Sequence, residues 1–331
     1  GKWGLGGPLP NDDFDYFRGF SGQGQYFREV DGKQMHLTRV MTDDALAFLE
    51  GDDDKRPWCL SISTKAPHVQ DGHPDPFRFD PALAELYADV EIPPAPVSDP
   101  KYFEMLPDFL QTSEGRVRWK QRFATPELYQ HSVKGYYRLI TGVDRMLGRI
   151  RETLEKNGQA DNTVIVLTSD NGFFLGEHGL AGKWFMYEES IRTPLIIFDP
   201  NLPEEHRGTE CNQITLNIDI APTLLEYSRA TIPAGMRGDS LRRTMLGHVR
   251  LWRSEFYYEH MFEHPRIPRS EGVRDERWKL VRYVDRDPVY EQLFDLENDP
   301  HEIDNLAGAK EHRDRLDAMR SRCKHWKELV A

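Results

Sequence analysis

The loop that follows residues 163–168 carries the side chains with the clearest capacity for chemistry in this chain. Those six residues form an apolar, β-branched run, which predicts a buried strand. Asp170 and Asn171 come at its carboxyl end, the edge at which open α/β sheets bind ligands. A carboxylate oxygen beside an amide oxygen suits a hard cation such as Ca²⁺ or Mg²⁺. His178 and Lys183, further along the loop, add groups that can hold an anion beside that cation.

Gly172 completes this motif, and we expect it to let the backbone turn sharply after the two oxygen donors. The alternative for Asp170 to Gly172 is an Asx-turn with a solvated loop behind it. The strand in front and the His and Lys behind favour the cation site.

The segment from Thr168 to Pro194, including the run Met186 to Pro194, resembles the metal-binding loop of the type I sulfatases, which belong to the alkaline phosphatase superfamily. On this resemblance Asp170 and Asn171 are metal ligands and Lys183 contacts the sulfate. Relatives that cleave phosphate or phosphonate esters commonly carry His after the Asp, so Asn171 favours sulfate esters.

The resemblance extends along nearly the whole chain. Residues 58–63 have an apolar strand pattern, and the Lys65 and His68 that follow resemble the sulfatase strand end whose Lys and His face the sulfate. This implies that His68 donates a proton to the leaving oxygen, work that suits its near-neutral pKa. The alternative for both side chains is a polar loop after a strand. Residues 272–306 resemble the small C-terminal subdomain of many bacterial sulfatases.

The first six residues resemble a second sulfatase signature, Gly-Lys-Trp-His-Leu-Gly, in which Lys2 matches a lysine that steadies the nucleophile. Gly4 departs from the family, which has His there. In the family this signature lies well inside the domain, after two metal-binding aspartates and a Cys/Ser-x-Pro-x-Arg motif that becomes the formylglycine nucleophile. None of these is present, so we expect an N-terminally incomplete sulfatase, inactive in isolation, with formylglycine in the missing N-terminal part.

The charge and composition of the chain argue against several classes of protein. The 331 residues carry a net charge of −12, which argues against a nucleic-acid partner, because phosphates require neutralisation by Lys and Arg. No apolar run approaches the roughly 20 residues of a membrane helix, and three cysteines exclude a dense disulfide framework. The resemblance favours a periplasmic or secreted location.

Strands that alternate with helical patterns predict an α/β fold. We expect a central, mostly parallel sheet with helices on both faces, alkaline phosphatase-like, over residues 1–245. A small α+β subdomain is expected over residues 246–331. Helices are predicted over residues 42–49, 81–88, 126–157, 218–227 and 312–329. A hairpin is predicted over residues 26–35, and a buried strand over residues 194–198.

Two hypotheses about function remain. In the first, the protein is a sulfatase acting on a small-molecule or carbohydrate sulfate ester, with Ca²⁺ or Mg²⁺ and with its missing N-terminal segment as a partner. Lys65, His68, Asp170, Asn171 and Lys183 then converge on one cleft, with His178 and His260 near the substrate, although His260 has the alternative of a hydrogen-bonded structural histidine. In the second, the protein is a non-catalytic sulfatase-like binding or interaction protein, which Gly4 favours.

Overall fold

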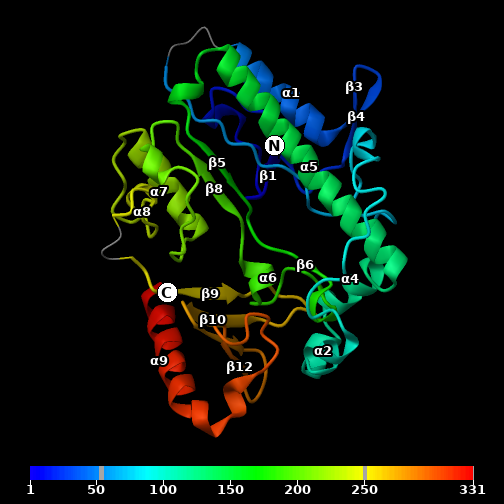
Figure 1. Cartoon of the computed structure of the whole chain (residues 1–331), viewed down its shortest axis with the longest axis vertical. Coiled ribbons are helices and arrows are strands. Elements are labelled where there is room, and N and C mark those ends of the chain that lie inside the picture. The colour runs from blue at the N-terminus through cyan, green and yellow to red at the C-terminus, as the bar shows by residue number, and fades with distance from the viewer. Residues whose placement is uncertain (52–55, 249–251, 331) are drawn as a thin grey trace. The chain divides into compact units, whose positions relative to one another are not determined.

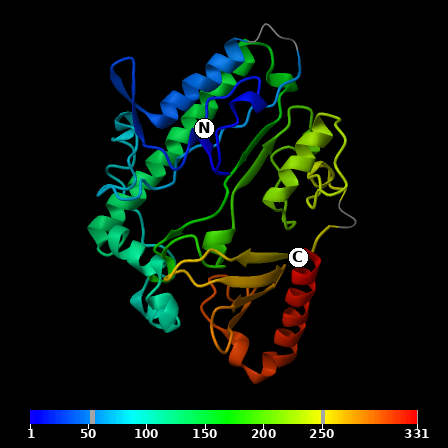
Figure 2. The ribbon, with the colours of Figure 1, turned by 180° about the vertical axis from the view of Figure 1, so that it is seen from behind.

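The computed structural model describes residues 1–51, 56–248 and 252–330 (Figures 1 and 2). The chain forms two compact units, residues 1–93 with 122–164 and residues 94–121 with 165–331. These units do not divide at residue 245, and the predicted domain boundary there stays a prediction. Within the described ranges, no helix is long and apolar enough to cross a membrane.

The first unit is built on two helices that lie side by side, α1 (Leu37–Glu50) and α5 (Pro126–Lys156) (Figure 1). We expected α1 to begin at Thr42, and this was wrong. The helix begins five residues earlier, because the His36 side chain accepts a hydrogen bond from the Thr38 backbone N–H and caps the first turn. Thr42 lies inside the helix and donates its hydroxyl to the Thr38 carbonyl.

The prediction of the long helix α5 is confirmed. The Thr125 side chain accepts a hydrogen bond from the Leu128 N–H, and Pro126 occupies the first turn, where its missing N–H costs nothing. Beyond the helix, Gly158 has φ +67°, a conformation that favours glycine. The predicted hairpin is also confirmed, as β3 (Phe27–Val30) and β4 (Lys33–His36).

Two predictions for the first unit fail. The helix expected over residues 81–88 is a single 3₁₀ turn, Pro81–Leu83, and Tyr87 has φ +60°, outside the helical region. Residues 58–63 form no assigned strand, although their side chains alternate between exposed and half-buried as in an extended chain. A strand also needs a neighbouring strand with which to exchange backbone hydrogen bonds. In the described part of the chain, residues 58–63 make one such bond, in which the Lys2 N–H donates to the Ser63 carbonyl at 2.8 Å.

In the second unit, β5 (Ile165–Thr168) pairs with β8 (Leu195–Phe198) antiparallel, with Thr168 opposite Leu195. The connection between them contains no long crossover helix, so the chain re-enters the sheet at the end it left. Strand β8 is not buried as predicted, since Ile196 is 60% and Phe198 46% exposed. The mixed α/β class is confirmed. Within the described strands, however, the only parallel pair is β1 (Lys2–Trp3) with β2 (Phe20–Ser21).

The predicted C-terminal subdomain is a four-stranded antiparallel sheet with a helix on one face. Its order is β12 (Tyr290–Asp295), β11 (Trp278–Tyr283), β10 (Ser270–Asp275), β9 (Glu255–His260), and the helix is α9 (Arg313–Val330). Both views show α9 running beside these strands (Figures 1 and 2).

Alternate side chains of this sheet enter two different cores, as the strand period of two requires. Those facing α9 pack with the helix in one cluster: Val273, Trp278, Leu280, Leu293, Leu316, Met319 and Cys323. Those on the opposite face join a second cluster from the same unit: Leu106, Leu110, Phe174, Leu180, Phe185, Met186, Tyr187, Val281, Tyr283 and Phe294. The sheet is therefore buried on both faces.

Short elements complete the second unit. They are α2 (Pro100–Glu104), α3 (Asp108–Gln111), α4 (Glu114–Arg122, which ends at the unit boundary), β6 (Phe174–Leu175), β7 (Ala181–Gly182), α6 (Glu188–Ile191), α7 (Ile220–Tyr227) and α8 (Arg242–Met245). The predicted helices at residues 218–227 and 312–329 are confirmed as α7 and α9 to within two residues.

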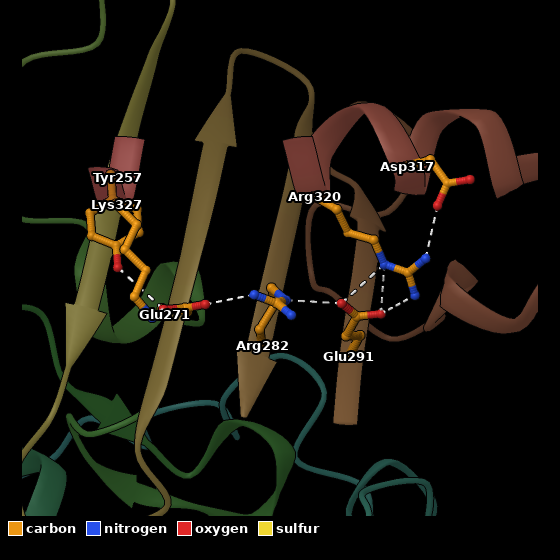
Figure 3. Close-up of polar contacts among 7 residues, drawn as sticks. All are labelled: Tyr257, Glu271, Arg282, Glu291, Asp317, Arg320 and Lys327. Carbon is orange, nitrogen blue, oxygen red and sulfur yellow. Dashed lines mark hydrogen bonds and ion pairs between the residues drawn. The ribbon is translucent and has the colours of Figure 1, made fainter. Parts of the chain in front are cut away.

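A row of charges clamps α9 to its sheet (Figure 3). Glu271, Arg282 and Glu291 stand opposite one another on β10, β11 and β12. Arg282 donates to Glu271 at 2.6 Å and to Glu291 at 3.0 Å. From the helix, Lys327 donates to Glu271 at 2.6 Å, and Arg320 pairs with Glu291. Glu271 is only 1% exposed, so these ion pairs replace the water contacts that its carboxylate loses on burial.

Removing that carboxylate should loosen the helix. We predict that Glu271→Ala lowers the free energy of unfolding by about 3 kcal/mol, because Arg282 loses one of its two carboxylate partners and α9 loses the contact of Lys327. Asp317→Ala is the matched control, since Asp317 pairs with Arg320 at 2.8 Å but is 59% exposed, and it should cost less than about 1 kcal/mol. Urea unfolding measures the free energy of unfolding of both variants. Equal losses would contradict a stabilising role for the contacts between Glu271 and α9.

Candidate active site

The predicted site residues fall in both units. Those in the first unit are Lys2, Lys65 and His68. Those in the second unit are Asp170, Asn171, His178, Lys183 and His260. The convergence of the two groups on one cleft stays a prediction.

Gln23 and Tyr26 organise the group in the first unit. Lys65 is 2% exposed, and its ammonium donates to the carbonyl oxygens of Gln23 at 3.0 Å and Val69 at 3.3 Å. The same ammonium lies 5.0 Å from the centre of the Tyr26 ring, a cation–π distance. Lys2 donates to the Gln23 side chain at 3.4 Å, so one glutamine brings two lysines into the same region.

Burial lowers the pKa of Lys65 to about 8, with the Lys2 charge adding to the shift and the Asp71 charge opposing it. At neutral pH the ammonium therefore remains mostly protonated, but its proton is lost at a much lower pH than that of an exposed lysine. A positive charge held in this way attracts an anion more strongly than a solvated one does.

His68 is held by its neighbours in one orientation. Its Nδ1 donates to the Val69 carbonyl at 2.7 Å, so Nε2 is the basic nitrogen of the neutral ring. The backbone carbonyl of His68 accepts the Tyr26 hydroxyl at 2.6 Å, and its N–H donates to the Lys65 carbonyl at 2.8 Å. Tyr26 thereby contacts both predicted catalytic residues, a role for which the sequence carries no signal.

In the second unit, Asp170 and Asn171 lie directly after β5, as predicted. The Ser169 hydroxyl donates to the Asn171 carbonyl at 2.9 Å. The Asn217 amide donates to the carbonyls of Ser169 at 3.1 Å and Asp170 at 3.3 Å. The Asn171 amide group donates to the Gly172 carbonyl at 2.7 Å, which leaves its side-chain oxygen available as an acceptor. Asn217 is distant in the sequence, and no local pattern points to it.

Gly172 serves a different purpose from the expected one. A Cβ at this position would lie 2.2 Å from the Glu189 carbonyl oxygen and 2.7 Å from that of Arg192. The Gly172 N–H donates to the Ser190 carbonyl at 2.8 Å. Glycine is needed here because α6 packs directly against the loop that follows β5, not because the backbone adopts a positive φ.

Asp170 and Asn171 fit a hard cation as part of a ligand set. Both offer oxygen atoms, and Asp170 is exposed at the strand end. Ca²⁺ takes about six to eight oxygen ligands, often several of them carboxylates. In the described part of the chain, no group of three or more His, Cys, Asp or Glu side chains is placed to hold a metal ion. The pair alone is therefore an incomplete site.

His178, predicted to help hold an anion beside the cation, lies in the interior of the second unit. It is 2% exposed, and burial lowers its pKa to about 4, so the imidazole is neutral at pH 7. Its ring lies 4.8 Å from that of Tyr187, and both line a cavity of about 30 Å³ with Gln292 and Glu302. A space of that size holds about one water molecule. Direct substrate binding by His178 stays a prediction.

The sulfate contact predicted for Lys183 and the substrate contact predicted for His260 stay predictions. Lys183 follows β7 and is half-buried. His260 ends β9 opposite Ser270, and burial lowers its pKa.

A buried lysine of the C-terminal sheet supports the loop that follows β5. Lys279 is 0% exposed, and its ammonium lies 2.7 Å from the Glu188 carboxylate and 2.8 Å from that of Glu302. Glu302 also accepts the Glu188 N–H at 2.7 Å. Glu188 begins α6, the helix that packs against Gly172. No local sequence pattern points to this network, because its members are far apart along the chain.

Two family models match the chain. The model described as Sulfatase matches residues 1–229, and the model described as N-sulphoglucosamine sulphohydrolase, C-terminal, matches residues 176–328. An N-acetylglucosamine-6-O-sulfatase from Bacteroides thetaiotaomicron is 30% identical over 94% of this chain and 66% of that protein. An arylsulfatase from Clostridium perfringens is 28% identical over 87% of this chain and 57% of that protein. The chain thus spans somewhat more than half of the length of each.

Solved structures agree on the fold. One, determined with its substrate D-glucosamine-2-N,6-O-disulfate, has a TM-score of 0.79 and 26% identity, covering 92% of this chain and 74% of that one. A phosphonate monoester hydrolase from Silicibacter pomeroyi has a TM-score of 0.76 and 25% identity, covering 95% of this chain and 66% of that one. Since the second acts on a different ester, the fold alone does not select the substrate.

The close packing at Gly172 yields a prediction. Gly172→Ala should lower the free energy of unfolding by about 1–3 kcal/mol, because its methyl group overlaps backbone atoms of α6. Gly148→Ala is the control, since a Cβ there meets nothing within 4 Å and lies in helix α5, where alanine stabilises by up to about 1 kcal/mol. Chemical denaturation compares the two; a neutral Gly172→Ala would show that the loop and α6 separate easily.

Proposed function

Because the chain belongs to the type I sulfatases of the alkaline phosphatase superfamily, we propose that its protein hydrolyses the sulfate ester of a carbohydrate. The observation that carries the proposal is the Asp170–Asn171 pair at the end of β5, with Lys183 on the same loop. Relatives described as acting on N-acetylglucosamine-6-sulfate esters and D-glucosamine disulfate support a sulfated amino sugar as the substrate class.

The neutral amide at position 171 supports sulfate over phosphate. In the superfamily, the enzymes that cleave phosphate or phosphonate commonly carry His after the Asp, and this chain has Asn171. The proposed cation is Ca²⁺ or Mg²⁺, bound in part by Asp170 and Asn171. When bound, it supplies Lewis-acid stabilisation of charge on the sulfate oxygens.

The chain's own residues hold the sulfate and move a proton. Lys65 and Lys2 place two positive charges near Gln23, and Lys183 adds a third from the metal loop, which stabilises negative charge on sulfate oxygens. His68, oriented through Nδ1 by the Val69 carbonyl, donates a proton from Nε2 to the leaving oxygen. The proposed formylglycine nucleophile comes from outside these residues, which contain no Cys-x-Pro-x-Arg or Ser-x-Pro-x-Arg motif.

The alternative function is a non-catalytic sulfatase-like binding protein. Gly4, where the resemblance leads one to expect His, favours it. A Cβ at Gly4 meets nothing within 4 Å, so its surroundings do not explain the glycine. Catalysis distinguishes the two functions, because a binding protein does not need a proton donor such as His68.

Substrate preference tests the proposal. In the protein that joins this chain to its nucleophile, we expect kcat/KM for an aryl sulfate to exceed that for the matching aryl phosphate by at least about tenfold. Asp170→Ala should lower sulfatase kcat/KM by about 10²-fold through loss of metal affinity. Asp144→Ala, an exposed carboxylate on α5, is the control and should change nothing. Faster phosphate turnover, or full activity in Asp170→Ala, would count against the proposal.

The lowered pKa of Lys65 predicts an upper pH limit for binding of the sulfate ester. As pH rises through about 8, Lys65 loses its proton and its charge, so KM for the sulfate ester should rise. Because the folded pKa is below the ordinary value, this group's contribution to stability rises with pH between about 8 and 10.5, so the lost affinity does not reflect unfolding. Lys65→Arg, charged throughout, should move the limit upward. An unchanged KM–pH profile in Lys65→Arg would assign the limit to another group.

A further inference from the structure

The first unit contains an open groove of about 440 Å³ that the proposed chemistry does not use. It lies between the β3–β4 hairpin and residues 78–82, and its walls include Phe27, His36, Arg39, Arg78 and Asp80. An open space of this size, with both aromatic and charged walls, accommodates a polar ligand of the size of a sugar.

Arg78 is the one cation of this groove without an acidic partner in the described structure. Its guanidinium carbon lies 4.8 Å from the centre of the Phe27 ring. Its backbone carbonyl accepts a hydrogen bond from Nε2 of His36 at 3.0 Å, and His36 is 4% exposed. Arg78 is therefore supported by stacking and by a buried neighbour while its charge remains uncompensated.

The other charges of the groove balance one another. Arg39 forms an ion pair with Asp80, whose second carboxylate oxygen accepts the Ala82 N–H at 3.0 Å. His36 adds no charge, because its Nδ1 accepts the Thr38 N–H and burial lowers its pKa. The groove keeps one net positive charge, on Arg78, and an anion bound there would neutralise it.

Tyr26 links one wall of this groove to the predicted catalytic residues of the same unit. One face of its ring stacks on His36, with centroids 5.2 Å apart and planes 15° apart. The Lys65 ammonium lies 5.0 Å from the same ring centre, and the Tyr26 hydroxyl donates to the His68 carbonyl. Because His36 lines the groove, this wall of the groove and the predicted catalytic residues Lys65 and His68 contact the same ring.

We propose that the groove binds a carboxylate or sulfate group on a neighbouring residue of the saccharide, with the Arg78 guanidinium as the bidentate donor and the Phe27 ring against the sugar. A guanidinium matches the paired oxygens of both anions. The inference rests on the proposed function and deepens it: the substrate is an anionic oligosaccharide, of which the groove holds the sugar that does not react.

The test is binding of a heparin-derived tetrasaccharide, which carries sulfates and carboxylates, to the 331-residue chain by calorimetry. Arg78→Ala should weaken binding about tenfold or more, as expected for loss of hydrogen bonds to a charged group. Arg78→Lys should restore only part of the affinity, since a lysine is a point charge. Arg28→Ala is the matched control, because Arg28 also stacks on a phenylalanine, Phe20, at 4.2 Å but lies outside the groove.

Equal affinity in the Arg78 and Arg28 variants would overturn the inference, as would inorganic sulfate that competes as strongly as the tetrasaccharide. An unfolding midpoint that matches the parent excludes misfolding, and Arg78→Gln replaces Arg78→Ala if the midpoint falls. In the enzyme that includes the nucleophile, Arg78→Ala should raise KM for the tetrasaccharide but leave hydrolysis of a small aryl sulfate unchanged. Arg78-dependent binding without any hydrolysis would refute the proposed function and leave the groove assignment standing.

Discussion

The buried ammonium of Lys279 is the interaction on which the second unit depends. A charge taken out of water is costly unless its hydrogen bonds are all supplied by the protein. Lys279 has the carboxylates of Glu188 and Glu302 at 2.7 and 2.8 Å, and the Met186 carbonyl at 3.2 Å. These partners come from separate segments, so the lysine is satisfied only when the central strands of the C-terminal sheet, the start of α6 and residue 302 are assembled together.

The assembly around Lys279 also fixes the loop that follows β5. Burial raises the pKa of Glu188, but the charges of Lys279 and Arg274 outweigh it and the net shift is downward, so the carboxylate stays ionised. Glu188 begins α6, and the carbonyls of the next residues lie against Gly172, beside the two oxygen donors. The C-terminal sheet, whose one predicted site residue is the substrate-binding candidate His260, thereby fixes the backbone that presents Asp170 and Asn171. The family model for the C-terminal part begins at residue 176 and therefore includes both Glu188 and Lys279.

In the first unit, the ring of Tyr26 connects the predicted site residues, much as Lys279 connects segments of the second unit. Tyr26 is fully buried, and Lys65, His68 and His36 all contact it. Around it are the lysines near Gln23 and the uncompensated Arg78, a local excess of positive charge within a chain of net charge −12. Such a focused charge attracts an anionic ligand even though the protein as a whole is acidic.

Sequence alone determined the features that depend on neighbours in the chain. The apolar period predicted α5, the charged C-terminal segment predicted α9, and the short motif placed Asp170 and Asn171 at a strand end. Tertiary structure decided the rest. A histidine cap moved the start of α1, a loop without a crossover helix made β5 and β8 antiparallel, and contact with α6 explained Gly172. Lys279 meets Glu188 across about ninety residues. Pairing at that range depends on which segments pack together, and side-chain spacing along a strand or helix carries no information about it.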